Sequence, residues 1–425
     1  MKSQLYAGTA RLDITPEPGH SLAGWILRRP STHKITPILA RALVLASADT
    51  CLALCTCDLL WVPGPLSRRL REAVQEACGI PLQHIFIFPS HNHFGPDVDV
   101  QTPQEQAYVD TLLTRFASIV RQARDNLRPA RWGTGHGREE SIAINSRFWR
   151  RDGTIAWVAA QLEQSAGATG PIDPEVGVLL ICDEQGQAIA TLYNYACHAN
   201  CQEGAGISAV SWDWVGYASQ TIESALGGET FFLLGACGNI HPARYQVANE
   251  MGKKLAGEVI HVAQEVKTIS RGSIAAWQRE FVLPARDFSS FDPQQIKTIC
   301  AQIEDEKTRL AVEAVFFDRL QALRTERRSR LTTEVGIIRL DDLAIVCIPG
   351  ELFVELGLEI KERSPFPYTW VAELVNDAIG YIPTRQAYEE GGYQTTTVAR
   401  VAPEAGELIV EESLTWLRDL RDFEQ

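Results

Sequence analysis

The stretch HIFIFPSHNHFGP, residues 84–96, joins an apolar run of strand length to two histidines that are separated by one residue. Isoleucine and phenylalanine favour a buried β-strand, and Pro89 ends the run. If the extended conformation continues past Pro89, the two-residue period of a strand places His91 and His93 on one face. Neutral imidazole is the commonest nitrogen ligand for zinc, so the pattern predicts a metal site at a strand end.

The composition predicts a globular protein whose partner is a small molecule. The chain has 425 residues, of which 45% are hydrophobic, enough for a large core. A net charge of −13 argues against nucleic acid or an anionic membrane surface as a partner. Neither a membrane-spanning run nor a signal-peptide pattern occurs, so we expect a cytoplasmic protein. Ten cysteines without a Cys-x-x-Cys pair predict reduced, buried thiols rather than a disulfide framework. The oligomeric state is left open.

Predicted strands and helices alternate along the chain, which is typical of an α/β protein. Period-two and apolar runs predict strands at 5–14, 39–48, 51–60, 84–89, 132–137, 142–149, 176–182, 188–195, 230–234, 343–348 and 369–374. Helical spacing predicts helices at 65–78, 102–127, 213–226, 243–266, 351–363 and 403–423. The charged segment 291–331 predicts a helical region packed on the body. We therefore expect one domain, 1–425, with a helical insertion near 288–331.

Three further polar residues follow predicted strands. His198 lies beyond the strand at 188–195, Glu351 follows Pro349-Gly350, and Tyr381 lies in a predicted loop at 376–384. Catalytic groups of α/β proteins gather on loops at strand ends, and two histidines with a carboxylate are typical of a hydrolytic zinc site. Each residue also has a purely structural interpretation. Glu351 is suited to the first turn of a helix, and Tyr381 to a half-buried position in a loop.

Several short motifs, taken in order, resemble the N-terminal catalytic domain of the neutral (non-lysosomal) ceramidases. They span nearly the whole chain and comprise Asp13-Ile14-Thr15, residues 90–96, the His198 loop, residues 211–218, Gly238-Asn239-Ile240-His241-Pro242, Pro349-Gly350-Glu351, residues 380–384 and Tyr388-Glu389. The resemblance implies an α/β fold of mixed sheets flanked by helices, in one large catalytic domain. It also implies hydrolysis of an amide that depends on one zinc ion.

Carried over by position, the resemblance assigns the residues of the site. It implies that the zinc ligands are His91, His198, Glu351 and Tyr381. It makes His93 the imidazole that protonates the leaving amine after activated water attacks the acyl carbon, and Tyr388 a hydrogen-bond donor to the oxyanion. Arg147, in the run Ala143-Ile144-Asn145-Ser146-Arg147, corresponds to the active-site arginine of the family, with Ser and Arg in altered order.

Two departures from the family bear on the substrate. Where the family has a serine, this chain has His241, so a serine nucleophile is excluded, and His241 is a candidate to hydrogen-bond the substrate or to add a metal contact. We also expect a protein without the immunoglobulin-like C-terminal domain and the secretory signal of the ceramidases. We therefore expect a smaller acyl-amide substrate, or an ester, rather than ceramide.

Three alternatives remain open from the sequence. A metallo-esterase or lactonase would use the same ligands on a different leaving group. The barrel of the classical amidohydrolases also begins with a His-x-His strand end, although there the pair follows the first strand, and here several strands precede residue 91. Finally, His241 would also fit a homologue that binds a ligand without turnover.

Overall fold

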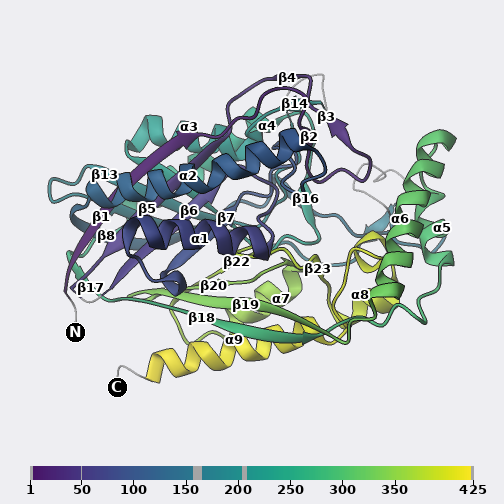
Figure 1. Cartoon of the computed structure of the whole chain (residues 1–425). Helices are drawn as coiled ribbons and strands as arrows, with labels where there is room; N and C mark the ends of the chain where they lie inside the picture. The colour runs from purple at the N-terminus through teal and green to yellow at the C-terminus, as the bar shows by residue number, and fades with distance from the viewer. Residues whose placement is uncertain (1–2, 49, 157–164, 203–207, 423–425) are drawn as a thin grey trace.

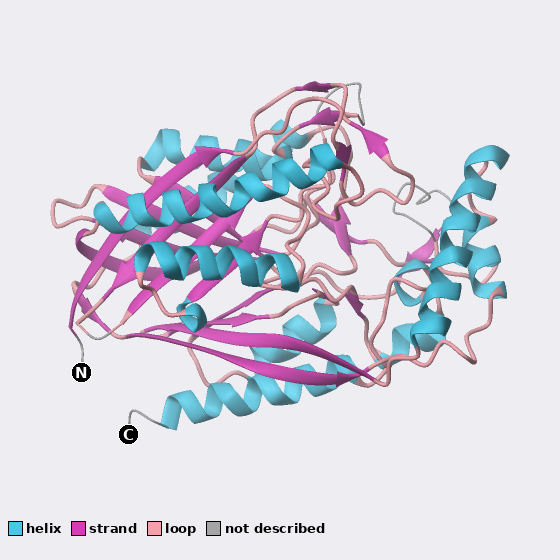
Figure 2. Cartoon of the chain, in the orientation of Figure 1, coloured by secondary structure: helices cyan, strands magenta, loops and turns pink. Residues whose placement is uncertain are grey.

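The computed structural model describes residues 3–48, 50–156, 165–202 and 208–422 of the chain. Two β-sheets pack face to face at its centre, and helices cover their outer faces (Figures 1 and 2). The predicted fold class, α/β with mixed sheets flanked by helices, is confirmed. Within the described residues, no helix has both the length and the apolar character needed to cross a membrane.

The larger sheet has nine strands and mixes antiparallel with parallel pairs. Its order is β15 (Glu229–Leu234), β13 (Ala188–Tyr195), β12 (Glu175–Cys182), β8 (Arg128–Arg138), β1 (Ser3–Asp13), β5 (Leu39–Ala46), β6 (Cys51–Cys57) and β7 (Ile85–Pro89), with β17 (Arg271–Gly272) beside β1. The pairs β6–β7 and β13–β15 are parallel. Because β7 and β15 are open edges, the sheet does not close, and the classical amidohydrolase barrel is excluded.

The smaller sheet has four strands in the order β18 (Ile274–Pro284), β19 (Arg330–Leu340), β20 (Leu343–Cys347) and β22 (Tyr368–Ala372). Its β20–β22 pair is parallel. Buried side chains from both sheets form one apolar core between them, to which Leu45, Phe86, Ile338 and Ile345 belong. This layer fixes how the ends of the two sheets lie relative to each other.

Strands of the larger sheet are buried on both faces, which explains their continuous apolar sequences. Along β6, Leu52 and Leu54 point toward the smaller sheet, while Ala53 and Cys55 point toward the helices. This alternation follows from the two-residue period of a strand.

Helices lie on both outer faces, as Figure 1 shows. The helices α1 and α2 pack on one half of the larger sheet, α3 and α4 on its other half, and α7 and α9 on the smaller sheet. The helices are α1 (Gly64–Cys78), α2 (Pro103–Asp125), α3 (Asp213–Leu226), α4 (Ala248–Glu265), α5 (Gln294–Cys300), α6 (Glu306–Glu326), α7 (Val354–Arg363), α8 (Arg385–Glu390) and α9 (Ala405–Asp422), with 3-10 turns η1 (Leu82–His84) and η3 (Tyr393–Thr395).

Short two-stranded pairs connect the loops at one end of the sheets. They are β2 (Ser21–Leu22) with β3 (Arg29–Pro30), β4 (His33–Lys34) with β14 (Ala209–Val210), β9 (Ala143–Asn145) with β16 (Ile240–Pro242), β10 (Phe148–Arg150) with β11 (Ser165–Ala168), and β21 (Glu351–Leu352) with β23 (Tyr381–Ile382). The pairs β4–β14, β9–β16 and β21–β23 join segments that are far apart in sequence, whereas β2–β3 and β10–β11 are local.

Several local predictions are wrong. The loop predicted at 376–384 contains strand β23, the strand predicted at 142–149 is divided into β9 and β10, and the helix predicted at 243–266 begins only at Ala248. Glu351 does not begin a helix, because it pairs with Tyr381 in β21–β23, and α7 begins only at Val354. Residues 330–331 belong to strand β19, so the predicted helical segment holds α5 and α6 but ends earlier. The extended conformation does not continue through His91, whose φ of 58° lies in the left-handed region.

The core between the sheets generates a stability prediction. Phe86 of β7 is fully buried, and Gly336 of β19 leaves room for its ring, since a Cβ there would lie 2.9 Å from Phe86 Cε1. We expect Phe86→Ala to lower the free energy of unfolding by about 3–5 kcal/mol. The control Val282→Ala, at a side chain that is 44% exposed, should change it by about 0.5 kcal/mol or less. Urea unfolding measures both, and equal midpoints would contradict the assigned core.

Candidate metal centre

The candidate site is built from loops that follow the carboxyl ends of parallel strands. His91 and His93 follow β7, His198 follows β13, Glu351 follows β20, and Tyr381 follows β22. Backbone contacts hold these loops together: His93 N donates to Ala199 O at 3.0 Å, and Asn92 pairs with Ala199 in a parallel bridge. Open α/β sheets place their ligands at this end of the strands.

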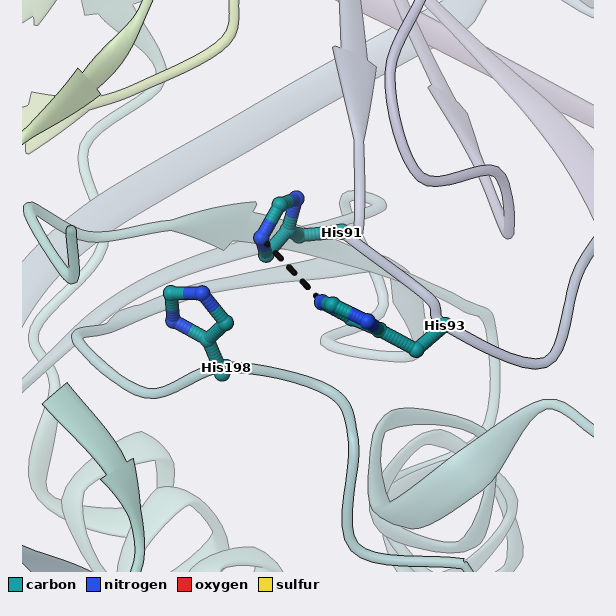
Figure 3. Close-up of side chains that lie close together, drawn as sticks. All are labelled: His91, His93 and His198. Atoms are coloured by element: carbon teal, nitrogen blue, oxygen red, sulfur yellow. Dashed lines mark hydrogen bonds between the residues drawn. The ribbon is translucent and has the colours of Figure 1, made fainter. Parts of the chain in front are cut away.

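Three imidazoles converge at the centre of these loops (Figure 3). One ligand atom from each of His91, His93 and His198 lies within 4.8 Å of the other two. The ring centroids of His91 and His198 are 4.4 Å apart, and those of His91 and His93 are 4.9 Å apart. The left-handed backbone at His91, rather than a continuous strand, therefore brings the predicted pair together.

Backbone carbonyls fix which ring nitrogen of each histidine faces the cluster. His91 Nδ1 lies 3.2 Å from Leu60 O, and His198 Nδ1 lies 3.0 Å from Ile240 O. His93 makes its backbone hydrogen bond to Gly24. Because a carbonyl only accepts, each of these ring nitrogens must carry a proton, which leaves Nε2 with its lone pair. Metal-binding histidines are oriented in the same way.

The resulting arrangement is suited to a cation. His91 Nε2 and His93 Nε2 face each other at 3.4 Å, and two lone pairs at this distance repel unless a proton or a cation lies between them. Burial lowers the pKa of His93 to about 3 and that of His198 to about 4, and burial lowers the pKa of His91 well below its ordinary value. The three side chains are therefore neutral at pH 7, the state that binds metal.

Glu351 supplies an oxygen to the same centre. Its Oε2 lies 3.6 Å from His91 Nε2 and 3.7 Å from His198 Nε2. Both Glu351 Oε2 and His198 Nε2 are buried without a hydrogen-bond partner. Burial raises the pKa of Glu351 to about 8, because it removes the carboxylate from solvent. The neighbouring imidazoles are neutral and do not offset the negative charge of the carboxylate. A buried carboxylate oxygen and imidazole nitrogen without hydrogen-bond partners are suited to bind a divalent cation such as zinc.

Tyr381 lies directly beside Glu351. The two residues are paired in register in β21–β23, and their side chains are hydrogen-bonded. Burial, and then the neighbouring Glu351, raises the pKa of Tyr381 well above its ordinary value. The structure thus brings together the four residues predicted as ligands. His93, the predicted proton donor, lies beside them.

His241 also belongs to this neighbourhood. Its ring stacks on that of His198, with centroids 4.3 Å apart and an interplanar angle of 18°. Its Nδ1 lies 3.1 Å from Asn200 Nδ2 and 3.2 Å from Tyr245 Oη. His241 therefore packs against the imidazole of one predicted ligand.

Two of the predicted catalytic residues make other contacts. Arg147 is buried and donates from Nη2 to Glu390 Oε2 at 2.9 Å. The Tyr388 hydroxyl donates to Val401 O at 2.7 Å, and the Arg286 guanidinium lies over its ring. Neither Arg147 nor Tyr388 is among the described residues that line the cavity at the site. Their assigned roles stay predictions that this geometry does not favour.

A cavity of about 510 Å³ opens onto the histidines. Its apolar lining residues are Trp25, Ile26, Leu27, Phe94, Ile303 and Val312. Besides the histidines and Arg29, its hydrogen-bonding lining residues are Ser146, Asn200, Gln202, Tyr245, Gln246, Thr308, Tyr381, Tyr393 and Gln394. Such a cavity, apolar with a few convergent polar groups, is typical of a small-molecule site.

The sequence interpretation missed Tyr393. This tyrosine lines the cavity, which Tyr388 does not, and its ring centroid lies 5.8 Å from that of Tyr381. A Gly-Gly pair precedes Tyr393, and the φ values of Gly391 and Gly392 are 78° and 102°. The only available signal was this pair, which indicates a turn close to the predicted Tyr381 loop.

Comparison with solved structures identifies the fold. The chain is similar to neutral ceramidase from Pseudomonas aeruginosa, with 16% identity, a TM-score of 0.72, and coverage of 99% of this chain and 75% of the other. A structure of ceramidase complexed with C2 matches with 15% identity, a TM-score of 0.70, and coverage of 99% and 76%. No protein-family model matches the chain, and no curated protein matches it. The chain therefore has the neutral ceramidase fold, as the sequence resemblance predicts.

The geometry generates a metal-binding prediction. We expect His91→Ala and His198→Ala each to lower the affinity for zinc by more than about 100-fold, because each removes a donor atom from the cluster. The control His136→Ala removes a histidine that lies outside the cluster and should leave the affinity unchanged. Equilibrium dialysis with elemental analysis measures zinc per chain. Full zinc content in both cluster variants would show that the ion binds elsewhere.

Proposed function

We propose that the chain is a zinc-dependent hydrolase that cleaves a linear amide bond in an N-acyl small molecule. One ion would be held by the four predicted ligands, His91, His198, Glu351 and Tyr381. The observation that carries the proposal is the convergence of three imidazole lone pairs and an unpartnered buried carboxylate oxygen beside a cavity. The neutral ceramidase fold supports it, because ceramidases cleave an acyl amide.

Zinc is favoured as the metal by the chemistry of the donors. Two neutral imidazole nitrogens with a carboxylate are typical of catalytic zinc sites. When bound, the ion supplies Lewis acidity, which polarises a carbonyl and acidifies a water molecule. No thiolate competes for it here, since burial raises the pKa of the nearby Cys237 well above its ordinary value.

His93 is the residue best placed to move a proton. It lines the cavity, its ring hydrogen-bonds to the Gly24 backbone, and its Nε2 lies 3.4 Å from His91 Nε2 in the cluster. In the proposed reaction, His93 Nε2 takes a proton from the attacking water and delivers it to the leaving nitrogen. An amide needs this second step because an amine anion is a very poor leaving group.

His241 occupies the position where the family has a serine. Histidine at this place cannot repeat a serine nucleophile, so water is the nucleophile in the proposed reaction. Since His241 both lines the cavity and stacks on His198, we assign it a role in positioning substrate and the His198 ring.

The substrate is proposed to be smaller than ceramide, with an acyl chain on the apolar side of the cavity. The apolar lining residues there are Trp25, Ile26 and Leu27 from one loop, with Ile303 and Val312 from the α5–α6 region, and Ile26, Leu27, Ile303 and Val312 belong to one apolar cluster. A cytoplasmic location belongs to the same proposal, because all ten cysteines are free.

Amide and ester hydrolysis differ in the leaving group, and this difference tests the role of His93. We expect zinc-loaded protein to hydrolyse N-octanoyl amides, and His93→Gln to lower kcat on them by about 100-fold or more. The loss on the p-nitrophenyl ester of octanoic acid should be smaller, because that leaving group needs no proton. The control His136→Gln should match the unaltered protein in both assays.

The outcomes of this assay separate the competing functions. Turnover of esters alone would establish the metallo-esterase or lactonase alternative. Zinc binding without turnover of either class would establish a homologue that binds ligands without catalysis. Activity that survives chelation of the metal would contradict the proposal as a whole.

Gly24 gives an independent test of how His93 is held. A Cβ at Gly24 would lie 2.3 Å from His93 Nδ1, so Gly24→Ala must displace the ring. We expect at least a tenfold loss of amidase kcat with unchanged zinc content, because His93 is not proposed as a ligand. Gly79→Ala is the matched control, since Gly79 also has a positive φ but has open space around it. A loss of zinc in Gly24→Ala alone would instead make His93 a ligand.

A further inference from the structure

Arg29 is the one arginine or lysine among the described residues that line the cavity, and no aspartate or glutamate accompanies it there. The adjacent Arg28 differs, because it forms an ion pair with Glu105. Arg29 belongs to β3, which pairs with β2 in the loop region above the histidines. Its charge is therefore available to something that enters the cavity.

The position of the Arg29 side chain is fixed by stacking. Its guanidinium carbon lies 4.2 Å from the centroid of the Trp25 ring. Trp25 is held in turn, because its Nε1 donates to His93 O at 3.0 Å. An arginine that stacks on an aromatic face keeps the N–H groups at its edge free for a ligand. The guanidinium is thus connected through one rigid ring to the segment that carries His93.

The hydrogen-bonding capacity of this guanidinium is not used by the protein. Arg29 Nη1 is shielded from solvent and has no partner within the described structure. Burial lowers the pKa of Arg29, yet a guanidinium remains charged at neutral pH. The Arg29 side chain as a whole is only partly buried, but a shielded donor nitrogen without a partner beside a cavity points to a ligand.

We propose that Arg29 and Trp25 form a subsite for a carboxylate, so that the substrate is an N-acyl amide with a carboxylate group, as in an N-acyl amino acid. A planar carboxylate matches the edge of the guanidinium fork, and the adjacent apolar part of the molecule can pack on Trp25, Ile26 and Leu27. The inference rests on the proposed function for the reaction, but the subsite itself is a binding property.

This charge acts locally. The net charge of −13 disfavours approach of an anion from a distance, and salt screens that repulsion beyond about 8–10 Å. Within the cavity, the charge-assisted hydrogen bond from Arg29 distinguishes a charged from a neutral ligand. We therefore expect the subsite to favour charged over neutral ligands at equilibrium, with little effect on the rate of association.

A binding experiment without turnover tests the subsite. The probe is 4-oxoundecanoic acid, in which a CH₂ replaces the amide NH of N-octanoylglycine, and its neutral partner is the primary amide of the same acid. We expect isothermal titration calorimetry to show tighter binding of the acid. Arg29→Gln should weaken binding of the acid by about 10- to 100-fold and leave the neutral probe unchanged.

Two further variants complete the design. Arg29→Lys should restore part of the affinity for the acid, because it keeps the charge but not the planar fork. Arg68→Gln removes one positive charge from an exposed position on α1 and should alter neither probe. If Arg29→Gln and Arg68→Gln bind the acid equally well, the subsite does not exist.

The same variants separate this inference from the proposed reaction. Hydrolysis of N-octanoylglycine and N-octanoylglycinamide with equal kcat/KM, unchanged in Arg29→Gln, would overturn the subsite and leave the amidase intact. Arg29-dependent binding of the acid without hydrolysis of either amide would uphold the subsite and overturn the amidase. A fall in kcat/KM for the glycine substrate alone in Arg29→Gln is the result that we expect.

Discussion

Backbone carbonyls decide the chemistry of this site, because they determine which nitrogen of each histidine is available. The bonds from His91 to Leu60 O and from His198 to Ile240 O leave two Nε2 lone pairs aimed at a common point. The left-handed backbone at His91 orients its ring in this way, at a conformational free-energy cost of about 1–2 kcal/mol. Strain of this size is sustained only where the surrounding structure holds the residue firmly.

The packing of the two sheets holds the site residues in place. The larger sheet supplies the histidines from β7 and β13, while the smaller one supplies Glu351 from the loop after β20. The shared core between the sheets fixes the distance of about 3.6–3.7 Å between the carboxylate and the imidazoles. Asn376 strengthens the connection, since it bonds to the backbone of Ile85 and Ile87 at the open edge of β7.

The cavity shows how one fold can serve different substrates. The strand-end loops carry the candidate metal ligands, whereas residues from the loop at 24–29 and from the α5–α6 region line other parts of the cavity. A change at Arg29 can therefore alter what is bound without moving the predicted ligand residues. This separation is consistent with a neutral ceramidase fold at 16% sequence identity.

Local sequence determined most of the elements and several of the site residues. The apolar run before Pro89, the hairpin of β5 and β6, and the start of α3 at Asp213 each follow from patterns within a few residues. The histidines were also evident, because their placement after strands is a local feature.

Only the tertiary structure decided the rest, because the deciding contacts join residues far apart in the chain. Glu351 resembled a helix start in sequence, but pairing with Tyr381 makes it a strand residue. The sequence pattern did not indicate which of Tyr388 and Tyr393 lines the cavity. In the folded chain it is Tyr393. The sequence also could not show that Arg29 Nη1 has no hydrogen-bond partner, because that depends on all the residues around it in the folded chain.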